Sequence, residues 1–105
     1  MNAEVRDPRI DVLMALLKKG EENAVDRDML ASLLGMGDRA TRELIEKARN
    51  EGNLILNKQN GKGYFLPGSI DDVKRQYIQD TNRAMAILKR RKHARKILKE
   101  AGIKV

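Results

Sequence analysis

The sequence predicts a mainly α-helical protein with one small β-hairpin and a long basic helix at its C-terminal end. Three observations lead to this prediction. Apolar residues recur at helical spacing in three segments before residue 52, and two short apolar segments then flank an Asn-Gly turn signal. After Gly68, no proline or glycine occurs until Gly102. A length of 105 residues fits one small domain with an appendage.

The first helix is expected over residues 8–19. Asp7 is a favourable cap, and Pro8 suits the first helical position, where its missing N–H costs nothing. Gly20 ends the pattern. The inward face of this helix would consist of Ile10, Leu13, Met14 and Leu17. Residues 21–25 are expected to form a polar loop.

Two short helices should follow, joined by Gly35-Met36-Gly37. Asp26 and Asp38 are expected to cap them. The earlier helix would bury one apolar stripe, formed by Met29, Leu30, Leu33 and Leu34. The later helix, which ends near Gly52, would bury Ala40, Leu44, Ile45 and Ala48. Two short helices joined by a glycine turn are the helix-turn-helix pattern.

A β-hairpin is expected next, with strands at 53–58 and 64–66 and a tight turn at 59–63 that carries the Asn-Gly signal. Ser69 and Asp72 then resemble a capping box, with Asp in place of the usual Glu. The helix that starts there should cover residues 69–101, which corresponds to about 50 Å at 1.5 Å per residue. We therefore divide the chain into a domain at 1–68 and a long basic helix at 69–105.

The long helix carries an imperfect heptad seam that Asp80 and Arg91 interrupt. Its first part, Ile70, Val73 and Tyr77, is expected to pack on the domain. Its later apolar residues have no partner within the domain, and they predict a homodimer through Ala84, Ile87, Ala94, Leu98 and Ala101.

Charge is concentrated in the same helix. The chain has a net charge of +7, residues 1–68 carry 11 basic and 11 acidic side chains, and residues 69–105 carry 11 basic and 4 acidic ones. Eight Lys or Arg residues and no acid lie between Arg83 and Lys99, endpoints included. Such a density predicts an anionic partner.

Several function classes are disfavoured. The chain has no cysteine and one histidine, His93, so no thiolate zinc site, metal site, cofactor site or nucleophile–base pair is expected, and we expect no enzyme. The longest apolar run, residues 12–17, is too short to span a membrane, and the polar N-terminal residues do not resemble a secretory signal. These features predict a soluble, cytoplasmic protein without a membrane partner, and no small-molecule effector is evident.

The order helix, helix-turn-helix and hairpin resembles the winged helix-turn-helix domain of biotin operon repressors. Residues 28–36 are similar to that family's second helix and turn, residues 39–52 to its recognition helix, and residues 61–66, Gly-Lys-Gly-Tyr-Phe-Leu, to its wing. The match covers about residues 8–68. The chain departs from the family at Gly37-Asp38, where a serine often caps the recognition helix, and it lacks a ligase or effector domain. The long Lys/Arg-rich helix also resembles small proteins of phages and prophages of Gram-positive bacteria.

This resemblance implies sequence-directed binding of double-stranded DNA by a transcriptional or phage-type regulator. A helix fits the major groove, so base contacts are expected from the exposed face near the start of the third helix, at Arg39, Thr41, Arg42 and Glu43. The hairpin lysines would contact the DNA backbone. The further candidates for DNA binding are Arg49, Lys58, Lys62, Lys89, Arg90, Arg91, Lys92 and Arg95.

Alternatives remain open at each of these places. The charged residues of the third helix can form an exposed face of salt bridges, and the wing can contact a protein. In that case the chain is a non-catalytic adaptor of a phage or replication complex. The basic helix can be a phosphate-binding arm, a dimerisation helix or both. A helix on a membrane surface is disfavoured, because residues 83–101 contain no aromatic anchor. Binding of single strands by base stacking is disfavoured, because only 3% of the residues are aromatic.

Overall fold

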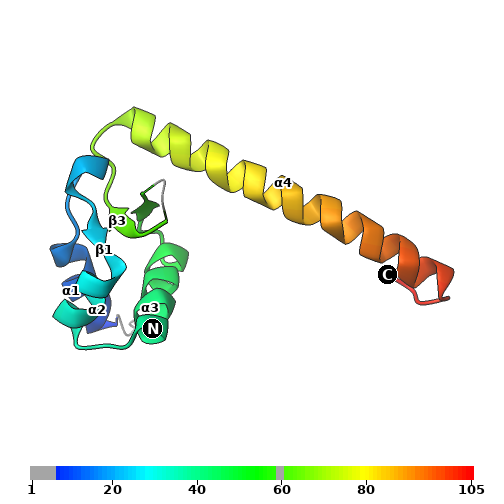
Figure 1. Cartoon of the computed structure of the whole chain (residues 1–105), viewed down its shortest axis with the longest axis horizontal. Coiled ribbons are helices and arrows are strands. Elements are labelled where there is room, and N and C mark those ends of the chain that lie inside the picture. Colours follow the sequence, from blue (N-terminus) through cyan, green and yellow to red (C-terminus); the bar gives the residue numbers. More distant parts are fainter. Residues whose placement is uncertain (1–6, 59–60) are drawn as a thin grey trace, which may run out of the picture. The chain divides into compact units, whose positions relative to one another are not determined.

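The computed structural model describes residues 7–58 and 61–105 (Figure 1). It is mainly helical, with a small three-stranded antiparallel sheet and a long C-terminal helix, which confirms the coarse fold class. Contacts divide the chain into two compact units, Met1–Val73 and Lys74–Val105.

The first helix, α1 (Pro8–Leu16), begins as the sequence predicts. The Asp7 carboxylate accepts a hydrogen bond from the Arg9 backbone N–H at 3.0 Å, and Pro8 lies in the first turn. Because this cap satisfies an otherwise unpaired donor, the start of α1 is determined by local sequence alone.

The end of α1 comes three residues earlier than expected. Leu17 is already extended, and the backbone after it pairs with Leu66. The Leu66 N–H donates to the Lys18 carbonyl at 2.8 Å, and the Gly20 N–H donates to the Leu66 carbonyl at 2.9 Å. Pairing with a segment far along the chain therefore overrides the helical propensity of the two lysines at 18 and 19.

The segment predicted as a polar loop instead contains a short 3₁₀ turn, η1 (Glu21–Asn23), and a strand, β1 (Val25–Asp26). This strand pairs with β3 (Gly63–Phe65), and β3 also pairs with β2 (Leu56–Asn57), so the sheet order is β1-β3-β2. The expected hairpin is therefore the larger part of a three-stranded sheet. Gly63 allows the close approach of β1, since a Cβ there would lie 3.3 Å from the Ala24 Cβ.

Two helices, α2 (Arg27–Leu34) and α3 (Asp38–Asn50), follow as predicted, and Gly35 between them has the left-handed conformation (φ 66°) that favours glycine. The expected side-chain caps are absent. Asp26 precedes α2 without a capping hydrogen bond, and α3 begins at Asp38 itself, with Gly37 as its N-cap. Asp38 binds arginine side chains instead, as described below.

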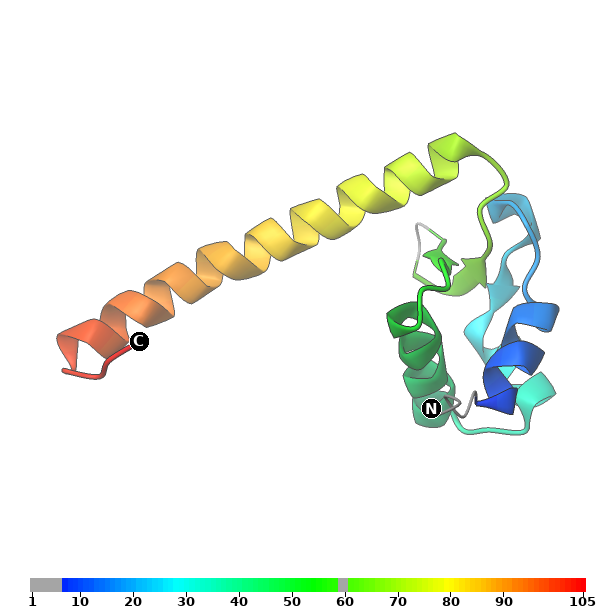
Figure 2. The ribbon, with the colours of Figure 1, turned by 180° about the vertical axis from the view of Figure 1, so that it is seen from behind.

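The core of this unit lies among α1, α2, α3 and the sheet, and its fully or nearly buried members are Ile10, Leu13, Leu17, Leu30, Leu44, Ile45, Ala48, Ile55 and Tyr64. Figures 1 and 2 show the three short helices gathered together with the sheet against one end of them. Three residues differ from expectation. Met29 and Leu33 are exposed, and on α3 it is Thr41 rather than Ala40 that faces inward.

The long helix, α4 (Ile70–Glu100), has 31 residues. The Ser69 hydroxyl accepts from the Asp72 N–H at 3.4 Å, and the Asp72 carboxylate accepts from the Gly68 N–H at 2.9 Å, which is close to the expected capping box. At the other end, the Ile103 N–H donates to the Leu98 carbonyl at 2.9 Å around Gly102 (φ 80°). This is the Schellman arrangement of a helix C-terminus.

The side chains of α4 are largely exposed. Ile70 is 79% exposed, so the prediction that it packs on the domain is wrong, whereas Val73 is partly covered. From residue 77 to residue 105, only Leu98 is partly covered. Heptad spacing alone does not bury an apolar side chain when no facing surface exists.

Candidate nucleic-acid interface

The first two turns of α3 present a charged surface to solvent. The Arg39 side chain is 89% exposed, and those of Arg42 and Glu43 are also exposed. Thr41 is fully buried, and its hydroxyl donates to the Gly37 carbonyl at 2.9 Å. The prediction that Thr41 contacts a base is therefore corrected: this hydroxyl closes the first turn of α3 and does not lie on the surface.

The arginines of this surface are paired with acids. Arg39 Nε lies 3.1 Å from Glu43 Oε1, and Arg42 Nε lies 3.2 Å from Asp38 Oδ2. The other oxygen of Asp38 accepts from Arg27 Nε at 2.5 Å. Exposed pairs of this kind contribute about 0–1 kcal/mol each, so a phosphate or base can replace the acid at little cost.

Arg27 connects this surface to the sheet. The pKa of its guanidinium is raised, first by a hydrogen bond with Tyr64 and then by the one with Asp38. Tyr64 lies on β3, the central strand, and Asp38 begins α3. Arg27, at the start of α2, therefore donates to Asp38 at the start of α3 and is influenced by Tyr64 on the central strand.

Arg49, a DNA-binding candidate on the sequence, holds the sheet to α3 instead. Its Nε and Nη2 donate to the Ile55 carbonyl at 3.0 and 2.9 Å, its Nη1 donates to Glu46 at 2.8 Å, and it also contacts the Asn57 side chain. Its guanidinium carbon lies 5.8 Å from the centroid of the Tyr64 ring. These contacts occupy the guanidinium, so the structure gives Arg49 a structural role that the sequence pattern did not indicate.

The wing lysines are exposed at the hairpin. Lys58 precedes the turn and Lys62 follows it, and the Lys58 N–H donates to the Gly63 carbonyl at 2.8 Å. Gly61 has φ 75°, as a tight turn requires of one residue there. The Asn-Gly turn prediction involves Gln59 and Asn60, which lie outside the described residues.

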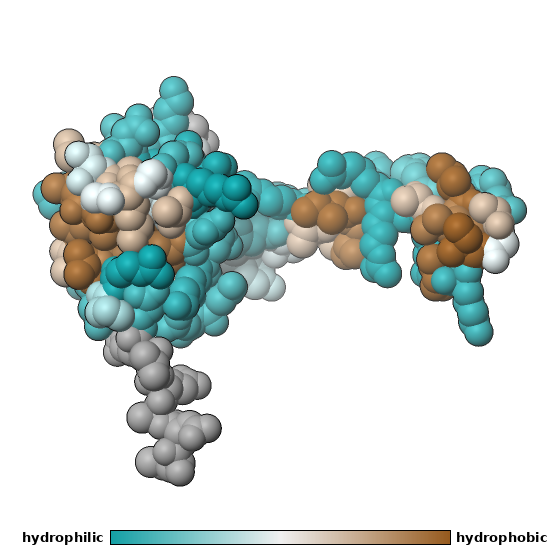
Figure 3. Space-filling model, turned by 90° about the horizontal axis from the view of Figure 1, so that it is seen from below, coloured by the Kyte–Doolittle hydropathy of each residue, from teal (hydrophilic) through white to brown (hydrophobic). Residues whose placement is uncertain are grey.

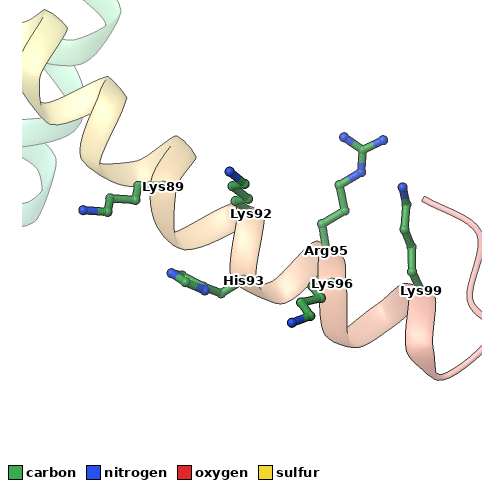
Figure 4. Close-up of a pocket in the computed structure, with 6 residues that line it drawn as sticks. All are labelled: Lys89, Lys92, His93, Arg95, Lys96 and Lys99. Carbon is green, nitrogen blue, oxygen red and sulfur yellow. The ribbon is translucent and has the colours of Figure 1, made fainter.

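On α4, the structure groups cations by helix face. Lys89, Lys92 and Arg95 line a hollow on the helix surface together with three residues that were not predicted, His93, Lys96 and Lys99 (Figure 4). Arg90 and Arg91, which were predicted, are not among its lining residues. The sequence prediction selected neighbours along the chain, whereas helical spacing from Lys89 onward would have identified the shared face.

The predicted dimerisation residues lie mostly on the other side of α4. Ala84, Ile87, Ala94 and Ala101 are exposed, and Leu98 is partly covered near the folded-back Ile103. Figure 3 shows two separate apolar areas along this helix with hydrophilic surface between them. The apolar surface of α4 is therefore interrupted, as the heptad analysis predicts.

Within residues 7–58 and 61–105, no cluster of His, Asp or Glu is arranged to hold a metal ion. In the same part of the chain, no helix combines the length and apolar character that crossing a membrane requires. No protein-family model, no curated protein and no solved structure matches this chain. The case for a function therefore depends on the geometry of the two charged surfaces.

Proposed function

We propose that the Met1–Val73 unit is a winged helix-turn-helix module that binds duplex DNA in a sequence-directed way, as a transcriptional or phage-type regulator. One observation carries the proposal: α3 follows α2 across the left-handed Gly35 and exposes Arg39, Arg42 and Glu43 on its first two turns. The order of elements and the sheet order β1-β3-β2 support it, because both fit this fold.

The exposed residues of α3 suit the edges of base pairs. An arginine can bind guanine through two hydrogen bonds, and a glutamate can accept one from cytosine, each good bidentate pair giving about 1–3 kcal/mol of discrimination. Arg39 and Glu43 are four residues apart and share one face of α3. On DNA, both side chains would give up their mutual ion pair and contact bases instead. The base contact of Arg39 and that of Glu43 would therefore form together.

The hairpin would hold the module on the DNA backbone. Lys58 and Lys62 lie on the two sides of the turn, and lysine binds phosphate as a point charge without sequence preference. The Arg49 contacts support this arrangement, since they fix β2 against α3. We therefore assign specificity to α3 and orientation to the hairpin.

The test starts with duplexes selected from a random library by the full chain. Arg42→Ala should weaken binding to the selected duplex by about 1–3 kcal/mol and leave binding to random duplex nearly unchanged. Lys62→Ala should weaken both to a similar degree. Lys18→Ala is the matched control, because it removes one exposed cation from outside α3 and the hairpin.

Two results would contradict the proposal. One is equal loss of affinity for selected and random duplex in Arg42→Ala. The other is a wild-type protein without duplex affinity tighter than about 10⁻⁴ M at low salt, because non-specific DNA-binding proteins already reach that level at physiological salt.

A second candidate is a non-catalytic protein adaptor, and exposed apolar surface on the first unit favours it (Figure 3). Val12 on α1 and Met29 and Leu33 on α2 are large and exposed. Surfaces of this kind often bind proteins. Leu33→Lys separates the candidates. If α3 is the functional surface, the substitution should leave DNA affinity intact. If α2 is the functional surface, it should abolish the biological activity of the protein in its host cell.

A further inference from the structure

The side chains that line the α4 hollow form two rows. Lys89, His93 and Lys96 point to one side in Figure 4, and Lys92, Arg95 and Lys99 point to the other. Within each row the residues are three or four positions apart, so at 3.6 residues per turn all six lie within a sector of about 160°. The hollow is the surface between the rows, and every residue that lines it is basic.

These side chains repel one another across successive turns. Lys92 has like-charged neighbours at Arg95 and Lys96, and both of those have Lys99 within four residues. Within the described part of the chain, no ion pair is made by the five Lys and Arg residues of the hollow, which are Lys89, Lys92, Arg95, Lys96 and Lys99. No acid lies between Arg83 and Lys99. Like charges at this spacing destabilise a helix by about 0.2–0.5 kcal/mol per pair. An anion placed between the rows would remove this cost.

The opposite side of the helix has a different character. Ala94, Ile97 and Ala101 lie there, and the two nearest arginines on that side are Arg83 and Arg90. Of the eight Lys and Arg residues from Arg83 to Lys99, five therefore lie in the sector of the hollow, and Arg83, Arg90 and Arg91 lie outside it. The unit Lys74–Val105 holds 11 basic and 2 acidic residues, so a partner must be anionic to approach the hollow.

We propose that this hollow binds one strand of the sugar-phosphate backbone of duplex DNA. The inference rests on the proposed function and deepens it, because α4 becomes the main source of sequence-independent affinity. Lys89 and Lys99 are ten residues apart, which is about 15 Å along the helix. One strand of DNA advances about 3.4 Å along the duplex axis per nucleotide, and its phosphates are farther apart than this along the winding strand, so the rows match fewer than about four phosphates.

The residues around the hollow favour DNA over an anionic membrane surface. A helix that lies on an anionic membrane usually combines cations with aromatic anchors, and the last aromatic residue of the chain is Tyr77, twelve positions before Lys89. A flexible row of phosphates needs only the charges.

The experiment compares two double variants of the full chain with equal net charge. Lys92→Gln with Lys96→Gln removes one cation from each row, and Lys74→Gln with Arg83→Gln removes two cations of α4 that do not line the hollow. Affinity for random duplex is measured by fluorescence anisotropy from about 50 to 200 mM salt. Each lost phosphate contact lowers the slope of log K against log salt by about 0.9, so the row variant should lose about two units and the control less than about one half.

Each outcome decides the matter. Equal slope changes in the two variants would show that net charge alone attracts the DNA, and they would overturn the proposal that the hollow is a binding site. Unchanged slopes in both, with wild-type DNA binding intact and Arg42→Ala still selective, would overturn the hollow and leave the proposed function standing. Absence of wild-type duplex binding would overturn both, and row-dependent binding to vesicles of anionic lipid in that case would assign the hollow to a membrane surface. Far-UV circular dichroism of both variants confirms that α4 remains helical.

Discussion

Helices α3 and α4 are both rich in cations, but they use them differently. On α3, Arg39, Arg42 and Arg49 each contact an acid of the same helix, and Lys47 lies 3.0 Å from Asp7 of the α1 cap. The cations of the α4 hollow have no such partners among the described residues. Net charge alone therefore does not show which basic helix can bind a polyanion. The positions of the acidic side chains show it, because they determine which cations are already paired.

The difference follows from packing. Leu44, Ile45 and Ala48 are buried, so α3 has a fixed place in a core, and its ion pairs add to an already determined geometry. From residue 77 onward α4 is exposed at every position but Leu98. The repulsion between the cationic side chains of α4 is not offset by burial. We therefore expect the stability of α4 to depend more strongly on salt and on anions than that of α3.

The largest expected effect is on the free energy of unfolding, and it concerns Arg49, the α3 cation with the most hydrogen bonds. Arg49→Ala leaves the part-buried Ile55 carbonyl without its donors and should lower the free energy of unfolding by about 1–3 kcal/mol. Arg90→Ala, the control on α4, should change it by less than about 0.5 kcal/mol. Urea titration in a Tyr77→Phe background reports on the first unit, because Tyr64 is then the only tyrosine and its fluorescence can be followed alone. Equal effects of the two substitutions would remove the contrast between the helices.

The next effect concerns association of the chain. We expect a homodimer through the α4 seam at salt high enough to screen its cations. Ile87→Gln should weaken the dimer by about 1 kcal/mol per chain, about half the gain from full burial of such a side chain. Leu88→Gln, which alters an equally exposed residue outside the seam, should not. Sedimentation equilibrium measures the dimer affinity of both variants. A wild-type protein that is monomeric at tens of micromolar would contradict dimerisation through the seam.

A smaller effect comes from reversing one charge on each helix. Lys92→Glu creates favourable pairs with Lys89, Arg95 and Lys96, each worth about 0.2–0.5 kcal/mol, and should raise helicity at low salt. Glu43→Lys replaces a favourable pair on α3 with a repulsive one and should lower stability by a similar amount. Circular dichroism at low and high salt checks both, because each change should fade as salt increases. A decrease of helicity in Lys92→Glu would show that repulsion does not limit α4.

The smallest effect at neutral pH is expected at Asp7. Hydrogen bonds from Arg9 and Lys47 hold the pKa of this carboxyl well below its ordinary value of 3.8. A lowered pKa in the folded state means that the contribution is complete above that ordinary value and is lost as the pH falls below it. Asp7→Asn keeps a good helix cap and removes the charge, so it should flatten the acid side of the stability profile. An unchanged acid profile in thermal unfolding would contradict this role.

Local signals in the sequence predicted the parts of the fold that local chemistry determines. Asp7-Pro8 gave the start of α1, Gly35 the turn before α3, and Ser69 with Asp72 the start of α4. Each of these is a cap or a turn whose hydrogen bonds close within four residues. Such features need no knowledge of the rest of the chain.

Features that depend on distant segments could not be predicted in this way. β1 has two residues, too few for an alternating pattern, and it exists because β3 pairs with it. The link from Arg49 to the Ile55 carbonyl depends on where β2 lies against α3. On the α3 surface, the sequence placed Arg39 and Arg42 correctly in solvent, whereas the burial of Thr41 follows from the rotation of α3 in its core.

The exposure of α4 also has a kinetic consequence. A helix without tertiary cover melts and re-forms in about 0.1–1 μs, whereas small folded domains typically open globally over times from below a second to days. α4 therefore samples coil many times during one lifetime of the folded Met1–Val73 unit. A ligand that binds between the cationic rows would lengthen each helical interval, so its occupancy could be followed as a slower helix–coil relaxation after a temperature jump.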